Sequence, residues 1–130
     1  MNEKKYTLSR AQIIKRRSDF QNVYHKGTAT PGRHMILYVL HDARVAGKVG
    51  FAAGKKLGSA PVRNRTKRLM REAYRLMQHE LRPDVGILLI GRAGLAARKM
   101  QDAAKDLRKI ARRAKILIEE GQAAQREARP

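Results

Sequence analysis

The sequence predicts a single α/β domain, an α+β two-layer sandwich in which a small mixed four-stranded sheet packs against about three helices. Its 130 residues, 42% of them hydrophobic, are enough for one domain with one modest core. Two segments, 34–41 and 84–90, are apolar runs of strand length. Two longer segments, 60–79 and 94–118, repeat apolar residues every three or four positions, as amphipathic helices do.

The N-terminal helix is expected to begin at Ser18, because Ser18 and Gln21 have the spacing of a capping box. Gly27 is of the residue type that commonly ends a helix. Residues 1–17 are basic and show no clear period, so we expect an arm that packs locally and is partly mobile at its tip. The apolar face of this helix consists of Phe20, Val23 and Tyr24.

Three segments have the character of strands. Segment 34–41 is rich in β-branched and aromatic residues, which favours a strand. A second strand covers 48–53, and the Ala46-Gly47 step before it suits a turn or a hairpin loop. Segment 84–90 is apolar almost throughout, which is typical of a strand covered on both faces. We therefore expect this last strand at the centre of the sheet.

The helix over 60–79 has two contrasting sides. Ser59 precedes it as a cap, and Pro61 is tolerated in its first turn. At 100° per residue, its basic and amide side chains fall within an arc of about 140°. That arc holds Arg63, Asn64, Lys67, Arg68, Arg71 and Arg75. The opposite side holds Val62, Leu69, Met70, Ala73 and Met77.

The last helix is expected over 94–118, followed by a disordered tail at 121–130. Asp102 and Asp106 lie among Lys105 and Lys109, so we expect ion pairs that stabilise the helix rather than acid–base chemistry. The apolar face of this helix is expected to hold Met100, Ala103, Leu107, Ile110, Ala114 and Leu117.

The charge of the chain indicates its class of partner. Thirty Lys and Arg against eleven Asp and Glu give a formal net charge of +19, which calls for a polyanion, usually nucleic acid. We therefore expect one RNA-binding domain over 1–130. The absence of cysteine excludes disulfides and thiolate metal sites. The polar N-terminus and the lack of any apolar run near 20 residues predict a cytoplasmic protein without a membrane partner.

The most basic part of the chain is segment 43–71, which has nine Lys or Arg and no acid. A solvated helix face normally alternates its charges, so this pattern favours phosphate binding. No catalytic group is expected, because the four histidines are scattered and none forms a metal-binding pair with a carboxylate. The expected RNA-binding residues are Lys55, Lys56, Arg63, Asn64, Arg65, Lys67, Arg68, Arg71 and Arg75.

The order of these motifs resembles a known family. The run 55–71, which begins with Lys-Lys-Leu-Gly and continues through Arg-Asn-Arg, closely resembles the signature of the bacterial ribonuclease P protein. Residues 19–24 with Gly27 resemble the first helix of that family, residues 35–38 its first strand, and residues 84–90 its late core strand. Departures are small: Pro61 stiffens the helix entry, and Tyr24 stands where Phe is common.

The resemblance implies more than the residues alone do. It implies a left-handed βαβ crossover, a cleft for the 5′ leader of precursor tRNA between the first helix and the sheet, and contact of the Arg-Asn-Arg side with the catalytic RNA. Lys55 and Lys56 are expected to contact leader phosphates. Tyr38 is expected to be exposed, whereas Phe20 and Ile36 suit the core equally well. The cleft is expected to be lined by Phe20, Tyr24, Ile36 and Tyr38.

The implied function is that of the protein subunit of ribonuclease P, which promotes endonucleolytic removal of the 5′ leader. The RNA is then expected to carry catalysis and to hold Mg²⁺, while the protein binds no cofactor by itself. The expected partners are the catalytic RNA, with one protein per RNA, and precursor tRNA; the free protein is expected to be a monomer. Charge and size equally allow a structural ribosomal or nucleoid protein, which has no need for an aromatic cleft.

Overall fold

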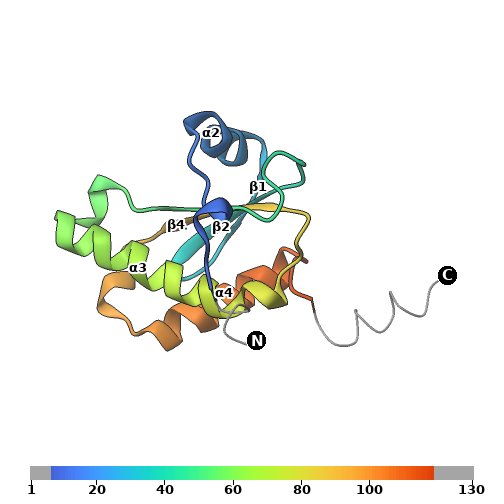
Figure 1. Cartoon of the computed structure of the whole chain (residues 1–130). Coiled ribbons are helices and arrows are strands. Elements are labelled where there is room, and N and C mark those ends of the chain that lie inside the picture. Colours follow the sequence, from blue (N-terminus) through green and yellow to red (C-terminus); the bar gives the residue numbers. More distant parts are fainter. Residues whose placement is uncertain (1–6, 119–130) are drawn as a thin grey trace.

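The structure is a computed structural model and describes residues 7–118. It confirms the expected α+β fold, with one four-stranded mixed sheet and three α-helices (Figure 1). The helices are α2 (Arg17–Lys26), α3 (Ala60–Met77) and α4 (Met100–Arg113), and short 3-10 turns are η1 (Arg10–Gln12), η2 (Lys55–Leu57), η3 (Gln78–Glu80) and η4 (Leu95–Ala97). The strands are β1 (Thr28–Pro31), β2 (Met35–Leu40), β3 (Val49–Ala52) and β4 (Gly86–Gly91).

The sheet has the order β1-β2-β4-β3, with β4 antiparallel to β2 and parallel to β3. The central position expected for the apolar strand is therefore confirmed. A turn does occur at Gly47, whose φ of 76° suits glycine and whose N–H donates to the carbonyl of Val85 at 3.0 Å. The expectation of a hairpin between β2 and β3 is wrong, because β4 lies between these two strands. A strand apolar on both sides is stabilised most at the centre of the sheet, where both of its faces are covered.

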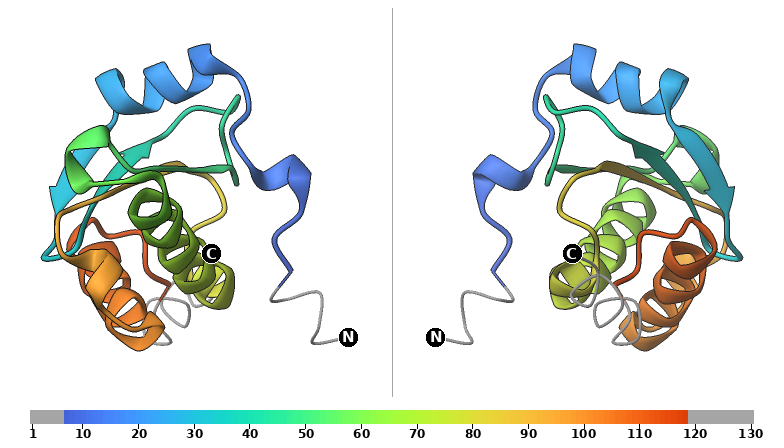
Figure 2. Two further views of the ribbon diagram at one scale, coloured as in Figure 1. Left: turned by 90° about the vertical axis from the view of Figure 1, so that its left-hand side faces the viewer. Right: turned by 90° about the vertical axis from the view of Figure 1, so that its right-hand side faces the viewer.

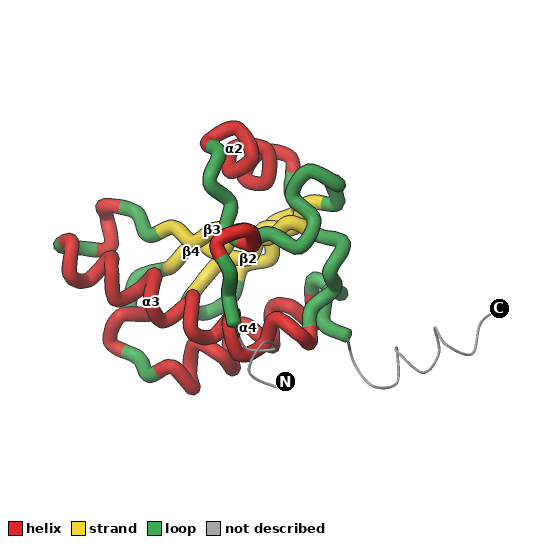
Figure 3. Tube along the Cα trace, in the orientation of Figure 1, coloured by secondary structure: helices red, strands yellow, loops and turns green. Residues whose placement is uncertain are grey.

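The sheet separates two hydrophobic clusters. Helix α2 lies over one face, and α3 and α4 lie side by side on the other (Figures 2 and 3). Alternate residues of a strand point to opposite faces, so Leu37 and Leu89 pack toward α3 and α4. On the other face Leu88 packs with Val23 of α2 and with Ile14, which precedes that helix.

The N-terminal arm packs against the edge strand of the sheet. Ile13 forms a parallel bridge with Val49, and the N–H of Ile14 donates to the carbonyl of Val49 at 2.9 Å. The tip of the basic arm over 1–17, which was expected to be mobile, begins outside the described residues, as does the tail at 121–130 that was expected to be disordered. Within residues 7–118, no helix is long and apolar enough to cross a membrane.

Strand β1 and the start of α2 differ from the sequence-based expectation. β1 is short, mostly exposed and ends in Pro31, and it pairs with β2 at the edge of the sheet, where proline is tolerated. α2 begins at Arg17 with no side-chain cap, so the capping box at Ser18 is wrong. The side chain of Gln21 instead hydrogen-bonds that of His25 at 2.8 Å.

Helix α4 is shorter than the 94–118 expected. Gly94 adopts a left-handed conformation, and the helix ends before Lys115, whose φ is 62°. Leu117 is buried in an extended segment that forms a β-bridge with Leu81. The three-to-four-residue spacing of apolar residues that predicted a helix up to residue 118 therefore continues past the end of α4. The expected pairing of Asp106 with lysines is also wrong, because its carboxylate accepts hydrogen bonds from backbone N–H groups at residues 33 and 34.

Candidate nucleic-acid interface

Helix α3 is held against the sheet by its buried side, which leaves its basic side facing outward. Thr66 is 1% exposed, and its hydroxyl donates to the carbonyl of Val62 at 2.8 Å. A Cβ added at Gly91 of β4 would lie 2.3 Å from the methyl carbon of Thr66, so helix and strand are in close contact. The remaining buried residues of α3 are Leu69, Met70, Ala73, Tyr74 and Met77.

Most cations on the outward side of α3 have no carboxylate partner among the described residues. Arg75 differs, since its Nε lies 2.8 Å from a carboxylate oxygen of Glu72. Arg65 donates from Nε to a backbone carbonyl at residue 96, at 2.5 Å, which leaves its charge uncompensated. Among residues 7–118, the α3 cations outside any ion pair with a carboxylate are Arg63, Arg65, Lys67, Arg68 and Arg71.

A groove of about 380 Å³ opens beside β3, which is an edge strand of the sheet. The guanidinium carbon of Arg71 lies 5.6 Å from the centre of the Phe51 ring, within cation–π range. Apolar and aromatic side chains thus meet cations here, the combination that single-stranded nucleic acid requires for bases and phosphates. We call this the α3 groove; it is lined by Ile13, Ile14, Phe20, Gly50, Phe51, Asn64, Lys67, Arg68 and Arg71.

Aromatic residues also gather where α2 lies over the sheet. The rings of Tyr24 and Tyr38 are 5.2 Å apart. Burial, the charge of Tyr24 and a hydrogen bond with Tyr24 raise the pKa of Tyr38 above its ordinary value. Tyr24 is 43% exposed whereas Tyr38 is half-buried, so the expectation that Tyr38 is the exposed residue is wrong. Tyr38 projects from β2 and packs against the cluster that contains Val23 of α2 and Leu88 of β4.

The other expected cleft residues lie near this aromatic pair. Phe20 is half-buried against the α2-side cluster and also lines the α3 groove, so it belongs to both surfaces. Ile36 is half-buried on the same face of β2 as Tyr38, two residues along the strand. The structure therefore places Phe20, Tyr24 and Tyr38 around α2, with Ile36 farther along β2.

Several expected RNA-binding residues do not line the α3 groove. Lys55 and Lys56 lie in η2 and are exposed. Arg63 is half-buried, and its Nε is buried with no hydrogen-bond partner among the described residues. Arg65 and Arg75 make the contacts given above and lie outside the groove.

Four residues of the α3 groove were not expected there from the sequence. Ile13 and Ile14 form an apolar pair in an otherwise basic arm, which signalled a contact with the core. Gly50 and Phe51 lie on β3, and their position could be found only once β3 was known to be an edge strand. The described part of the chain holds no group of three or more His, Asp or Glu side chains placed to bind a metal ion.

Comparison with known proteins decides the family. The family model described as Ribonuclease P matches residues 8–115. The chain belongs to the ribonuclease P protein family. A ribonuclease P protein component from Clostridioides difficile is 32% identical over 112 residues, which cover 85% of this chain and 98% of the relative. One from Symbiobacterium thermophilum is 36% identical over 115 residues, which cover 88% of this chain and 100% of the relative.

Solved structures of the family agree with the fold described above. The RNase P protein of Staphylococcus aureus matches with a TM-score of 0.72 and 27% identity, covering 83% of this chain and 99% of that protein. The RNase P protein of Thermotoga maritima, 20% identical, shares the fold with a TM-score of 0.67 over 77% of this chain and 94% of that one. The known role of the ribonuclease P protein family is tRNA 5′ processing, which implies an RNA partner. The alternative of a structural ribosomal or nucleoid protein is set aside.

Proposed function

We propose that this chain is the protein subunit of a ribonucleoprotein endonuclease in the cytoplasm, where it holds a catalytic RNA and the 5′ leader of precursor tRNA. The observation that carries the proposal is the position of Phe20, which lies beside the α2 aromatic residues and also lines the basic α3 groove. A single strand that leaves the aromatic surface can therefore meet cations of α3 without crossing the domain.

The α2 side supplies stacking surface for the leader. Tyr24 presents an exposed ring, and Tyr38 and Phe20 present partly exposed rings next to it. Stacking of a base on an aromatic ring is worth about 1–3 kcal/mol and tolerates any base. Such a surface suits leaders of varied sequence.

The α3 side supplies phosphate contacts. Lys67, Arg68 and Arg71 line one groove and have no carboxylate partner within the described chain, so RNA phosphates can neutralise them without first breaking an ion pair. An Arg side chain can hold one phosphate with two parallel donors. Asn64, in the same groove, can hydrogen-bond a base edge or a sugar hydroxyl. This face contacts the catalytic RNA, and it also meets the leader where the leader leaves the aromatic surface.

The reaction is hydrolysis of one phosphodiester bond, which releases the leader and leaves a 5′-phosphate on the tRNA. Mg²⁺ is held by the RNA and stabilises the charge that develops at the reacting phosphate. The protein, one per RNA and monomeric when free, adds positive charge and leader contacts. These contacts raise the affinity for precursor tRNA and lower the Mg²⁺ concentration that cleavage requires.

The test is cleavage of precursor tRNA by a bacterial ribonuclease P RNA at a Mg²⁺ concentration too low for the RNA alone. Adding this protein should restore cleavage at the mature 5′ end. An unrelated basic protein at equal total positive charge is the control for simple charge neutralisation. If the control restores cleavage equally, or if this protein restores none, the proposal fails.

A further inference from the structure

A second basic groove lies at the opposite edge of the sheet from the α3 groove. It has a volume of about 630 Å³ and is formed by α4 and the turn between β1 and β2. β1 is one edge strand and β3 is the other, so the two grooves flank the sheet. We call this the α4 groove; it is lined by Pro31, Gly32, Arg33, His34, Arg98, Asp102, Lys105, Asp106, Lys109 and Arg113.

The wall of the α4 groove is fixed by contacts between the turn and α4. The carboxylate of Asp106 is 7% exposed and accepts hydrogen bonds from the backbone N–H groups of Arg33, at 3.1 Å, and His34, at 2.8 Å. Arg113 donates to the carbonyl of Pro31. A Cβ at Gly32 would lie 2.6 Å from a methyl carbon of Ile110, so the turn lies directly on the helix. The groove is therefore formed before any ligand binds.

The groove carries excess positive charge. Five of its lining residues are Lys or Arg and two are Asp. Both acids are engaged by backbone N–H groups, Asp106 as above and Asp102 by that of Lys99 at 3.2 Å. Within residues 7–118 no ion pair with a carboxylate is made by Arg33, Arg98, Lys105 or Lys109.

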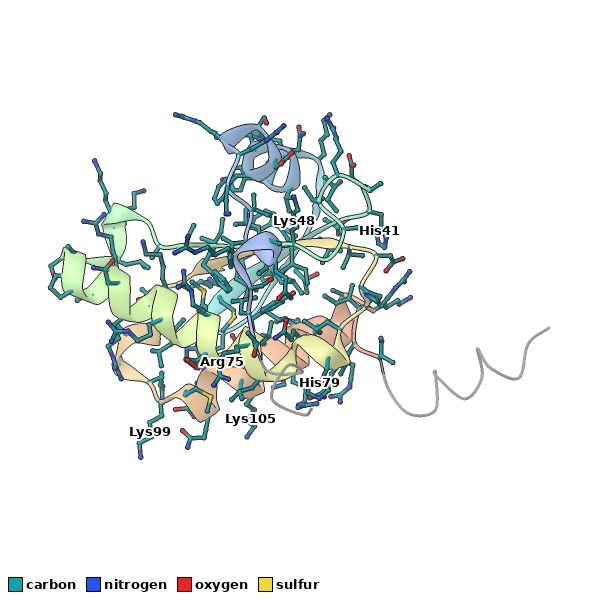
Figure 4. All side chains as sticks on the ribbon, viewed as in Figure 1. His41, Lys48, Arg75, His79, Lys99 and Lys105 are labelled. Carbon is teal, nitrogen blue, oxygen red and sulfur yellow. The ribbon has the colours of Figure 1, made fainter. Side chains whose placement is uncertain are left out.

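The cations of α4 are arranged in a row. Lys105, Lys109 and Arg113 follow one another at four-residue intervals, which places them about 6 Å apart on one side of the helix. All three are exposed. Figure 4 shows Lys105 on the side of the domain away from α2. A row of this kind suits a ligand with regularly repeated negative charge.

The lining chemistry favours an RNA backbone over a protein. Protein interfaces depend on buried aromatic or large aliphatic residues at their centre, and Pro31 is the only sizeable apolar side chain among the residues that line this groove. Among the described residues, the groove has no Asn, Gln, Phe, Tyr or Trp to hydrogen-bond adenine or to stack on bases, and both of its carboxylates already accept backbone N–H groups. What it offers a nucleic acid is mainly its row of cations, which bind phosphates whatever the base. Phosphate contacts require only cations and backbone N–H groups.

We propose that the α4 groove is a second RNA-binding surface, which binds the phosphate backbone without regard to base identity. Together with the α3 groove it gives the domain cationic surfaces at both edges of its sheet. The proposal requires only that the chain binds RNA, and it holds whichever RNA supplies the strand. The catalytic RNA and precursor tRNA are the two possible sources.

The test compares wild-type protein with the double variant Lys105→Gln, Lys109→Gln. A control pair, Lys26→Gln with Lys115→Gln, removes the same charge from exposed positions that line neither groove. Binding to oligouridine, to a ribonuclease P RNA and to precursor tRNA is measured between 50 and 200 mM salt, with thermal denaturation as the check on folding. Two lost contacts to a single strand should reduce the slope of log affinity against log salt by about 1.4.

With a slope change of about 1.4, the ratio of wild-type affinity to variant affinity should fall roughly sevenfold as the salt concentration rises fourfold. The control pair should leave the slope near that of wild type. A change with the catalytic RNA alone, or with precursor tRNA alone, supports the proposal and identifies the source of the strand. Unchanged slopes with every RNA, or equal changes in the control pair, overturn it. Binding to poly-glutamate is measured in the same way, and a larger loss with poly-glutamate than with any RNA also overturns the proposal, in favour of an acidic protein partner.

A second measurement does not depend on lost affinity. Because the chain has no cysteine, Lys109→Cys introduces a single thiol that can carry a photo-crosslinker. RNA should crosslink at this position and not at the matched position of a Lys26→Cys variant. Crosslinking at Lys109 no stronger than at Lys26 refutes the assignment of the groove.

Discussion

Replacing Arg71 with Gln should weaken RNA binding and reduce its dependence on salt. Arg71 is exposed, lines the α3 groove and has no carboxylate partner within residues 7–118. Each neutralised phosphate of a duplex contributes about 0.9 to the slope of log affinity against log salt. A hydrogen bond to a charged group is worth about 1.5–3 kcal/mol, so affinity at low salt should fall by about tenfold or more.

A matched control lies one turn farther along the same helix. Arg75 and Glu72 form an ion pair at 2.8 Å, and replacing both with Gln removes one charge of each sign. The net charge of the chain is then unchanged, and no free cation has been lost. The double variant Glu72→Gln, Arg75→Gln should therefore keep the wild-type slope, although Arg75 was among the residues expected to bind RNA.

The assay is equilibrium binding of a labelled ribonuclease P RNA at salt concentrations from 50 to 200 mM. Over this fourfold range of salt concentration, the ratio of wild-type affinity to Arg71→Gln affinity should fall by about 3.5-fold. Thermal denaturation checks that the lost contact with Phe51 has not unfolded the protein. Equal slope changes in the two variants, or an unchanged slope for Arg71→Gln, contradict the assignment of Arg71 to phosphate binding.

Three further predictions concern the cleft, the packing of α3 and alkaline stability. Tyr24→Leu should weaken binding of precursor tRNA by about 1–3 kcal/mol and leave mature tRNA binding unchanged, because Tyr24 offers an exposed ring for stacking; equal losses for both substrates count against the cleft. Gly91→Ala should lower the free energy of unfolding by about 1–3 kcal/mol, because its new methyl meets that of Thr66, and adding Thr66→Ser should restore part of the loss in urea denaturation. Burial raises the pKa of Tyr74 from 10.0 to about 12, so its contribution to stability is complete below pH 10 and is lost as pH rises toward 12. Tyr74→Phe should reduce that alkaline loss, and identical pH profiles for the two proteins oppose this explanation.

The sequence predicted best those helices and strands in which the pattern of apolar and polar residues follows burial from one end of the element to the other. α3 matches its expected range closely, since its buried and basic sides alternate with the helical period over its full length. β4 was recognised as central because it is apolar on both faces. Sequence could not place β4 between β2 and β3, because strand order depends on contacts between distant segments.

The candidate site was predictable in its charge and only partly in its geometry. Arg68 and Arg71 could be expected on one face of α3, because the helical period alone determines that face. Phe51 could not be assigned to the same groove, because it reaches α3 only through the packing of an edge strand. The pairing of Arg75 with Glu72 depends on the choice of side-chain rotamers, which the sequence pattern does not specify.

The insertion of β4 has a consequence for how the chain matures during synthesis. β2 and β3 are made early, and each lacks its neighbour on the inner side until residue 91 has been added. By then α3 has already been made, because it precedes β4 in the chain. Non-local pairing of this kind is slow compared with helix formation. The basic helix and the local β1–β2 pair can therefore form on the emerging chain, whereas β3 can join the sheet only after β4 has been made.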